Sequence, residues 1–149
     1  MKRSADFAVA IPPFHLMLKL EIVTPERKVI DAEVDSVTVP TLSGEAGIMP
    51  QHAPLISALK PGVVTVTTKG NAEKLAVGTG FVEVSNNRVS VLTDVAEKAG
   101  EIDAEKARSD KAEIDKELAA ASQLPADETE ELRERADLAS ARIDVSRSV

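Results

Sequence analysis

The stretch Ile-Asp-Ala-Glu-Val-Asp-Ser-Val-Thr-Val, residues 30–39, contains two runs, 30–34 and 36–39, in which apolar and polar side chains alternate. Successive side chains of a β-strand point to opposite faces, so this period of two is typical of strands with one buried and one wet face. The period recurs in four further segments, residues 18–22, 64–67, 82–84 and 89–91. Turn-forming residues separate these segments, which predicts a β-sandwich over residues 17–95.

Beyond Gly100 the apolar residues change to a helical period. They form two runs separated by Pro125: Ala104, Ala107, Ile114, Leu118 and Ala121, then Leu132, Ala136, Ala139 and Ile143. Asp103 and Asp127 are suited to cap the first turns of the two helices. The fold class is therefore mainly β plus α, an N-terminal β-sandwich followed by an antiparallel two-helix hairpin over residues 100–149. Because its apolar seam is rich in Ala, we expect the hairpin to dock weakly and to detach easily, with a permanently packed helical appendage as the alternative.

Charge and glycine content change at the same position as the period. Residues 1–93 hold 9 acidic and 9 basic side chains, whereas residues 94–149 hold 16 acidic and 9 basic ones. All seven glycines lie at or before Gly100. This composition break predicts a domain boundary, and residues 1–16 are predicted to form a flexible extension ahead of the sandwich.

The composition argues against several classes of function. The chain has no Cys, two His and 2% aromatic residues, and it carries a net charge of −7. An acidic chain without aromatic stacking platforms is a poor nucleic-acid ligand, and no spacing of His and acidic residues predicts a metal site. No apolar run is long enough for direct membrane insertion. We therefore expect a non-catalytic protein without a cofactor that works by contact with partner proteins.

One segment of the β-rich half is dense in Gly and Pro, residues 43–55, Ser-Gly-Glu-Ala-Gly-Ile-Met-Pro-Gln-His-Ala-Pro-Leu. Gly44 and Gly47 can adopt positive φ, and Pro50 and Pro54 have a fixed φ. The pattern predicts a connection with a defined, non-regular path. A structured connection of this kind is a candidate binding loop.

This segment, together with residues 58–62, 80–84 and 89–94 and the helix start at residues 102–103, resembles the epsilon subunit of F-type ATP synthase. The resemblance extends over residues 18–145. It implies a sandwich followed by a helical hairpin, the order that the residue periods also predict.

The resemblance implies a non-catalytic rotor subunit of the central stalk that couples the gamma subunit to the c-ring. Glu45 matches the acidic residue that approaches the polar loops of the c-ring, and His52 matches the gamma and c-ring contact region. For His52, a local hydrogen bond that braces the loop is the alternative. Gly44, Gly47 and Pro50 would shape this partner-binding loop. The implied location is peripheral, on the cytoplasmic face of the bacterial inner membrane.

For the hairpin, the resemblance implies contact with the catalytic alpha/beta head and a weak ATP site. The positions of this weak ATP site are occupied by Glu97, Asp103, Lys106 and Arg142, where Lys106 replaces the Arg of the family's ATP motif. Glu113 and Leu138 stand at two further positions where strong ATP binders carry Arg. Residues 127–149 hold 7 acidic and 4 basic side chains, a charge that opposes contact with an acidic head surface. Whether the hairpin inhibits ATP hydrolysis stays open, as does an alternative function as a stand-alone nucleotide-sensing or adaptor protein.

Overall fold

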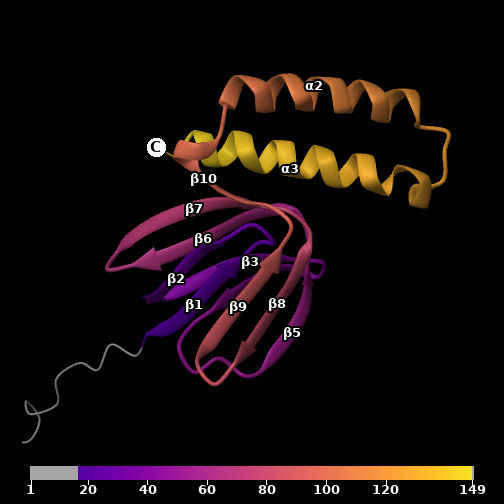
Figure 1. Cartoon of the computed structure of the whole chain (residues 1–149). Coiled ribbons are helices and arrows are strands. Elements are labelled where there is room, and N and C mark those ends of the chain that lie inside the picture. Colours follow the sequence, from indigo (N-terminus) through magenta and orange to yellow (C-terminus); the bar gives the residue numbers. More distant parts are fainter. Residues whose placement is uncertain (1–16, 149) are drawn as a thin grey trace, which may run out of the picture.

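A computed structural model describes residues 17–148 as a β-sandwich with a helical hairpin on top (Figure 1). This arrangement confirms the predicted fold class. The predicted extension over residues 1–16 lies outside the described residues.

The sandwich contains ten strands: β1 (Leu18–Val23), β2 (Lys28–Val34), β3 (Ser36–Thr41), β4 (Gly44–Ile48), β5 (Leu55–Leu59), β6 (Gly62–Thr68), β7 (Asn71–Val77), β8 (Gly80–Ser85), β9 (Arg88–Thr93) and β10 (Ala96–Lys98). Their order in the sheet is β10-β7-β6-β3-β5-β8-β9-β1-β2, and β4 pairs with β3. All pairs are antiparallel except β1 with β9. Strand β3 joins the two layers, since it pairs with β6 through residues 36–38 and with β5 only at Thr41.

The core between the layers is aliphatic, and each of the ten strands contributes to it. Leu18, Leu20 and Ile22 of β1 are fully buried, and the residues between them are half-buried. This is the one-sided burial that the period of two predicts. The predicted strands therefore carry the core at the predicted positions.

Two strands do not follow the expected pattern. Strand β4 occupies residues that we expected to be non-regular, because it pairs with β3 in a five-residue register from Val37↔Ile48 to Thr41↔Gly44. Strand β7 ends in Leu75-Ala76-Val77, all fully buried, because the sandwich core lies on one face and a helix covers the other. A strand that is buried on both faces loses the alternation by which it could be found.

The hairpin consists of α2 (Ala104–Ala120) and α3 (Glu130–Ser146), preceded by the short helices η1 (Ala99–Glu101) and η2 (Ala126–Thr129). Asp103 caps α2 as predicted, since its side chain accepts a hydrogen bond from the Lys106 amide. The predicted cap at Asp127 is wrong, because Asp127 lies within η2 and α3 begins only after Thr129.

The two helices pack through a small apolar seam. Ile114, Ala136 and Ala139 are buried there, with half-buried Leu118 and Leu132 around them. Helix α3 lies between α2 and the sandwich, where it contacts β6 and β7 (Figure 1). In the part of the chain that the structure describes, no helix is both long and apolar enough to cross a membrane.

Candidate functional site

The turn between β3 and β4 carries the first group of predicted site residues. Gly44 has a φ of 116°, which favours glycine, and the Thr41 hydroxyl donates a hydrogen bond of 2.6 Å to the Gly44 carbonyl. Leu42, at the tip of this turn, is 72% exposed. Glu45, the second residue of β4, lies opposite Pro40, and its side chain is exposed. The tip therefore presents an apolar residue and a carboxylate to a partner.

A second turn follows at Pro50. The His52 amide donates to the Met49 carbonyl at 3.1 Å, and Gln51 has a φ of 65°. Pro at the second position and positive φ at the third are features of a type II turn. Gln51 has the positive φ of this turn, whereas Gly47, which could adopt one, lies in β4 without it.

Asn87 anchors this second turn and was missed as a structural residue. Its side-chain oxygen accepts from the Gln51 amide at 2.9 Å, and its side-chain nitrogen donates to the Met17 carbonyl at 2.7 Å. Asn86 and Asn87 both have positive φ, which is typical of Asn in tight turns. The loop is thus fixed to the β8–β9 turn and to the start of β1.

The structure does not bring Glu45 and His52 into one cluster. Among the described side chains they share no hydrogen bond or ion pair. The His52 Nδ1 atom lies 2.7 Å from the Ala53 carbonyl oxygen, and the imidazole is half-buried. This geometry supports the bracing alternative for His52, whereas the exposed Glu45 carboxylate is available to a partner.

An exposed apolar face, formed by Ile56, Phe81 and Leu92, covers strands β5, β8 and β9. These side chains are 75%, 61% and 55% exposed. Phe81 lies directly opposite Leu92 on β9 and Ala58 on β5. Adjacent apolar residues within a strand are the sequence signal that could have identified this face. Neighbouring apolar pairs such as Phe81-Val82 within a strand must place one member on each face of the sheet.

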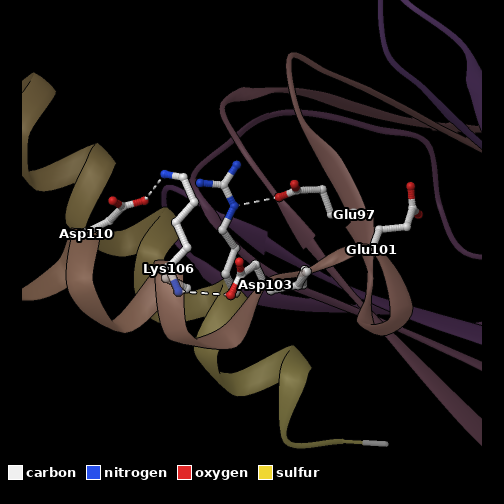
Figure 2. A pocket seen from close by; sticks show the side chains of 8 residues that line it. Glu97, Glu101, Asp103, Lys106 and Asp110 are labelled. Carbon is white, nitrogen blue, oxygen red and sulfur yellow. Dashed lines mark hydrogen bonds and ion pairs between the residues drawn. The ribbon is translucent and has the colours of Figure 1, made fainter.

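The residues matched to an ATP site come together between the hairpin and the sandwich (Figure 2). Glu97 comes from β10, Asp103 and Lys106 from the start of α2, and Arg142 from α3. They line a cavity of about 220 Å³, together with Glu101 and Asp110, which the sequence analysis missed. Of the two positions where strong binders carry Arg, Leu138 lines a neighbouring cavity, and Glu113 is exposed on α2.

Each cation in this cavity already has a carboxylate partner. The Arg142 Nε donates to Glu97 Oε1 at 2.6 Å, and the Lys106 Nζ lies 2.9 Å from Asp110 Oδ2. Glu101 pairs with Arg27 of the β1–β2 turn. A phosphate group would have to displace these carboxylates, and a lining with four acidic and two basic side chains opposes an anion.

In residues 17–148, no group of three or more His, Asp or Glu side chains is placed to hold a metal ion.

The sandwich, its Gly-Pro loop and the trailing hairpin define a class of protein. The family model for the β-sandwich domain of the ATP synthase delta/epsilon chain matches residues 17–99, more than half of the chain. The chain therefore belongs to the ATP synthase delta/epsilon family, which confirms the resemblance.

Within this family the similar curated proteins are epsilon chains. The ATP synthase epsilon chain of Desulforamulus reducens is 47% identical over 100 residues, which cover 67% of this chain and 76% of that one. The epsilon chain of Carboxydothermus hydrogenoformans is 50% identical over 91 residues, covering 61% and 68%.

A solved structure resembles the chain over its whole length. A chain of the Euglena gracilis mitochondrial ATP synthase, from a structure of OSCP, F1 and the c-ring, superposes with a TM-score of 0.67 at 22% identity. The match covers 99% of this chain and 94% of that one, so the sandwich and the hairpin are shared as a fold.

Proposed function

We propose that this chain is a non-catalytic rotor subunit of an F-type ATP synthase. It binds the gamma subunit and the c-ring in the central stalk and has no active site of its own. The observation that carries the proposal is the exposed apolar face on β5, β8 and β9. Large apolar side chains that gather on one surface of a folded domain are typical of protein interfaces.

The apolar face is suited to the gamma subunit. Three large side chains, each more than half exposed, lie on adjacent strands of a sheet held by an aliphatic core. Fully burying one such side chain stabilises a complex by about 1.5 to 3 kcal/mol. A rotor subunit must transmit torque, and an apolar contact on a rigid sheet is appropriate for a permanent partner.

The β3–β4 tip is suited to the polar loops of the c-ring. It presents the exposed Glu45 carboxylate beside the exposed Leu42, and Gly44 sets the backbone of the turn. Pro50 and the bond from Gln51 to Asn87 hold the following segment in place. Gly47, in β4, has open space where a side chain would lie, so a partner can approach its backbone closely.

We infer a peripheral location on the cytoplasmic face of a bacterial inner membrane, because a subunit bound to the c-ring reaches the membrane through that partner. Contact of the hairpin with the catalytic alpha/beta head remains a prediction. The stand-alone nucleotide sensor is less favoured, because the cavity's own carboxylates already occupy Lys106 and Arg142.

Binding to purified gamma subunit from the same genome tests the apolar face. Changing Ile56 and Phe81 together to Ser should weaken binding by at least about 100-fold, since each loss amounts to about 1.5 to 3 kcal/mol. Leu124→Ser is the matched control, because Leu124 is an exposed apolar residue between the helices. Unchanged binding of the double variant would refute the assignment of this face.

The c-ring contact is tested separately with Glu45→Gln. Binding to purified c-ring should fall several-fold and become less sensitive to salt, because a charge-assisted contact is lost. Glu26→Gln removes an exposed carboxylate from the β1–β2 turn and should have no effect. An equal effect of both changes would show that only the net charge matters.

A further inference from the structure

The apolar contact between the hairpin and the sandwich is small. Among residues 17–148, its buried cluster consists of Ala76, Ala141 and Val145, with Val63, Ala99 and Ile102 packed around them. Two of the three buried side chains are single methyl groups, and each buried carbon contributes only about 0.8 kcal/mol. Helix α2 contributes no residue to this cluster, so the hairpin is held to the sandwich mainly by the last turns of α3.

A polar contact lies beside this apolar cluster. Arg142 follows Ala141 on α3, and its Nε donates to Glu97 on β10 at 2.6 Å. The two side chains are 29% and 27% exposed, so water screens this pair less than a pair on an open surface. The other ion pair from α3 to the sandwich, Lys74 with Asp144, is longer at 3.7 Å and more exposed.

Both cations of the cavity around this pair are already paired with carboxylates of the chain itself. Lys106, the second cation of the cavity, is paired with Asp110 on its own helix (Figure 2). Arg142 is thus the side chain that links the hairpin to the sandwich across the cavity, and its partner is a carboxylate of this chain rather than a bound anion.

We propose that the Arg142–Glu97 ion pair is a latch that holds the helical hairpin against the β-sandwich with no nucleotide bound, and that ionic strength sets the docked population. The hairpin stays intact when the latch opens, because its own seam at Ile114, Ala136 and Ala139 lies away from the sandwich. The inference concerns the free chain and does not depend on the proposed rotor role.

Thiol protection measures the docked population, because the chain contains no cysteine. A Val145→Cys variant of the full chain carries a thiol in the docking interface, where Val145 is fully buried. A Val82→Cys variant carries a thiol in the sandwich core, where Val82 is fully buried. The first thiol reacts when the hairpin undocks, and the second reacts only on global unfolding.

Adding Arg142→Met should raise the labelling rate of the interface thiol about fivefold, whereas the core thiol, which reacts only on global unfolding, should stay far slower than the interface thiol in both chains. Arg108→Met, which removes the same charge from an exposed position of α2, is the matched control and should change neither rate. The reversed pair, Glu97→Arg with Arg142→Glu, should restore most of the protection. Failure of the reversal, or an unchanged rate in Arg142→Met, overturns the latch.

Salt and nucleotide test the remaining parts of the proposal. Raising the salt from about 0.1 M to about 1 M shortens the Debye length from about 10 Å to about 3 Å and so weakens the ion pair. The labelling rate of the interface thiol should therefore increase more with salt in the Val145→Cys chain than in the same chain carrying Arg142→Met. Mg-ATP at about tenfold excess over the chain should leave the labelling rate within about twofold, a free-energy change of under about 0.5 kcal/mol. A larger slowing by Mg-ATP would show that nucleotide closes the hairpin and would refute a ligand-independent latch.

Discussion

Ending the chain after Ala99 tests whether the sandwich is an independent folding unit. The hairpin covers the sandwich through α3, which buries Ala76 and half-buries Val63. Exposing the Ala76 methyl costs about 0.8 kcal/mol, and further exposure of Val63 adds roughly 1 kcal/mol. Loss of the Arg142–Glu97 pair adds at most about 1 kcal/mol, so the sandwich should lose about 2 to 3 kcal/mol.

A loss of this size should leave the sandwich folded, since domains of this length are stable by about 5 to 15 kcal/mol. Each lost kcal/mol lowers the melting temperature of such a domain by about 4 to 8 °C, so we expect a decrease of about 10 to 20 °C. Thermal unfolding followed by circular dichroism, on residues 1–99 and on the full chain, gives this difference directly. The fragment should also retain binding to the gamma subunit, because the proposed contacts precede the cut.

A chain that ends after residue 95 is the informative comparison. This cut follows the predicted sandwich boundary, but it removes β10, which pairs with β7 from Ala96↔Val77 to Lys98↔Leu75 and buries Ala96. We expect a further loss of about 1 to 3 kcal/mol and a sheet edge that promotes aggregation. An unfolded 1–99 fragment, or equal stability of the two fragments, would show that the division of the chain is wrong.

Two other predictions concern the sandwich. Gly80→Ala should destabilise it by about 3 kcal/mol or more in urea denaturation, because a Cβ atom there would lie 1.9 Å from a backbone carbonyl oxygen of β9. A Cβ atom at Gly47 would meet open space, so Gly47→Ala should change the free energy of unfolding by less than about 1 kcal/mol. If Gly80→Ala and Gly47→Ala destabilise the sandwich equally, this reasoning is wrong. The hydrogen bond from Lys19 to Asp31 holds the pKa of Asp31 below its ordinary value of 3.8, so Asp31 contributes stability above that pH and loses it as the pH falls through the lowered pKa. In Asp31→Asn the melting temperature should therefore fall less steeply as the pH drops below about 4. An equally steep fall in the variant and the parent chain would count against this hydrogen bond.

Features that depend on neighbours along the chain could be predicted from the sequence. The alternation at Leu18, Leu20 and Ile22 predicts a strand and identifies its buried face, because the strand period is a local property. The cap at Asp103 is local for the same reason, since its side chain bonds an amide three residues away. The loop motif around Gly44 and Pro50 identified the family, because its unusual composition does not depend on the rest of the fold.

Features that depend on distant partners were decided by the tertiary structure. Strand β4 exists because residues 44–48 find β3, and the Leu75-Ala76-Val77 run is uninformative in sequence because α3 covers its outer face. Arg142 and Glu97 are 45 residues apart and meet only when the hairpin docks. Pairing and two-sided burial follow from contacts between elements, which the period of a single element does not contain. The sequence therefore determined the family and the elements with a clear local period, whereas packing determined β4, the two-sided burial of β7, the exposed surfaces and the place where the two parts are joined.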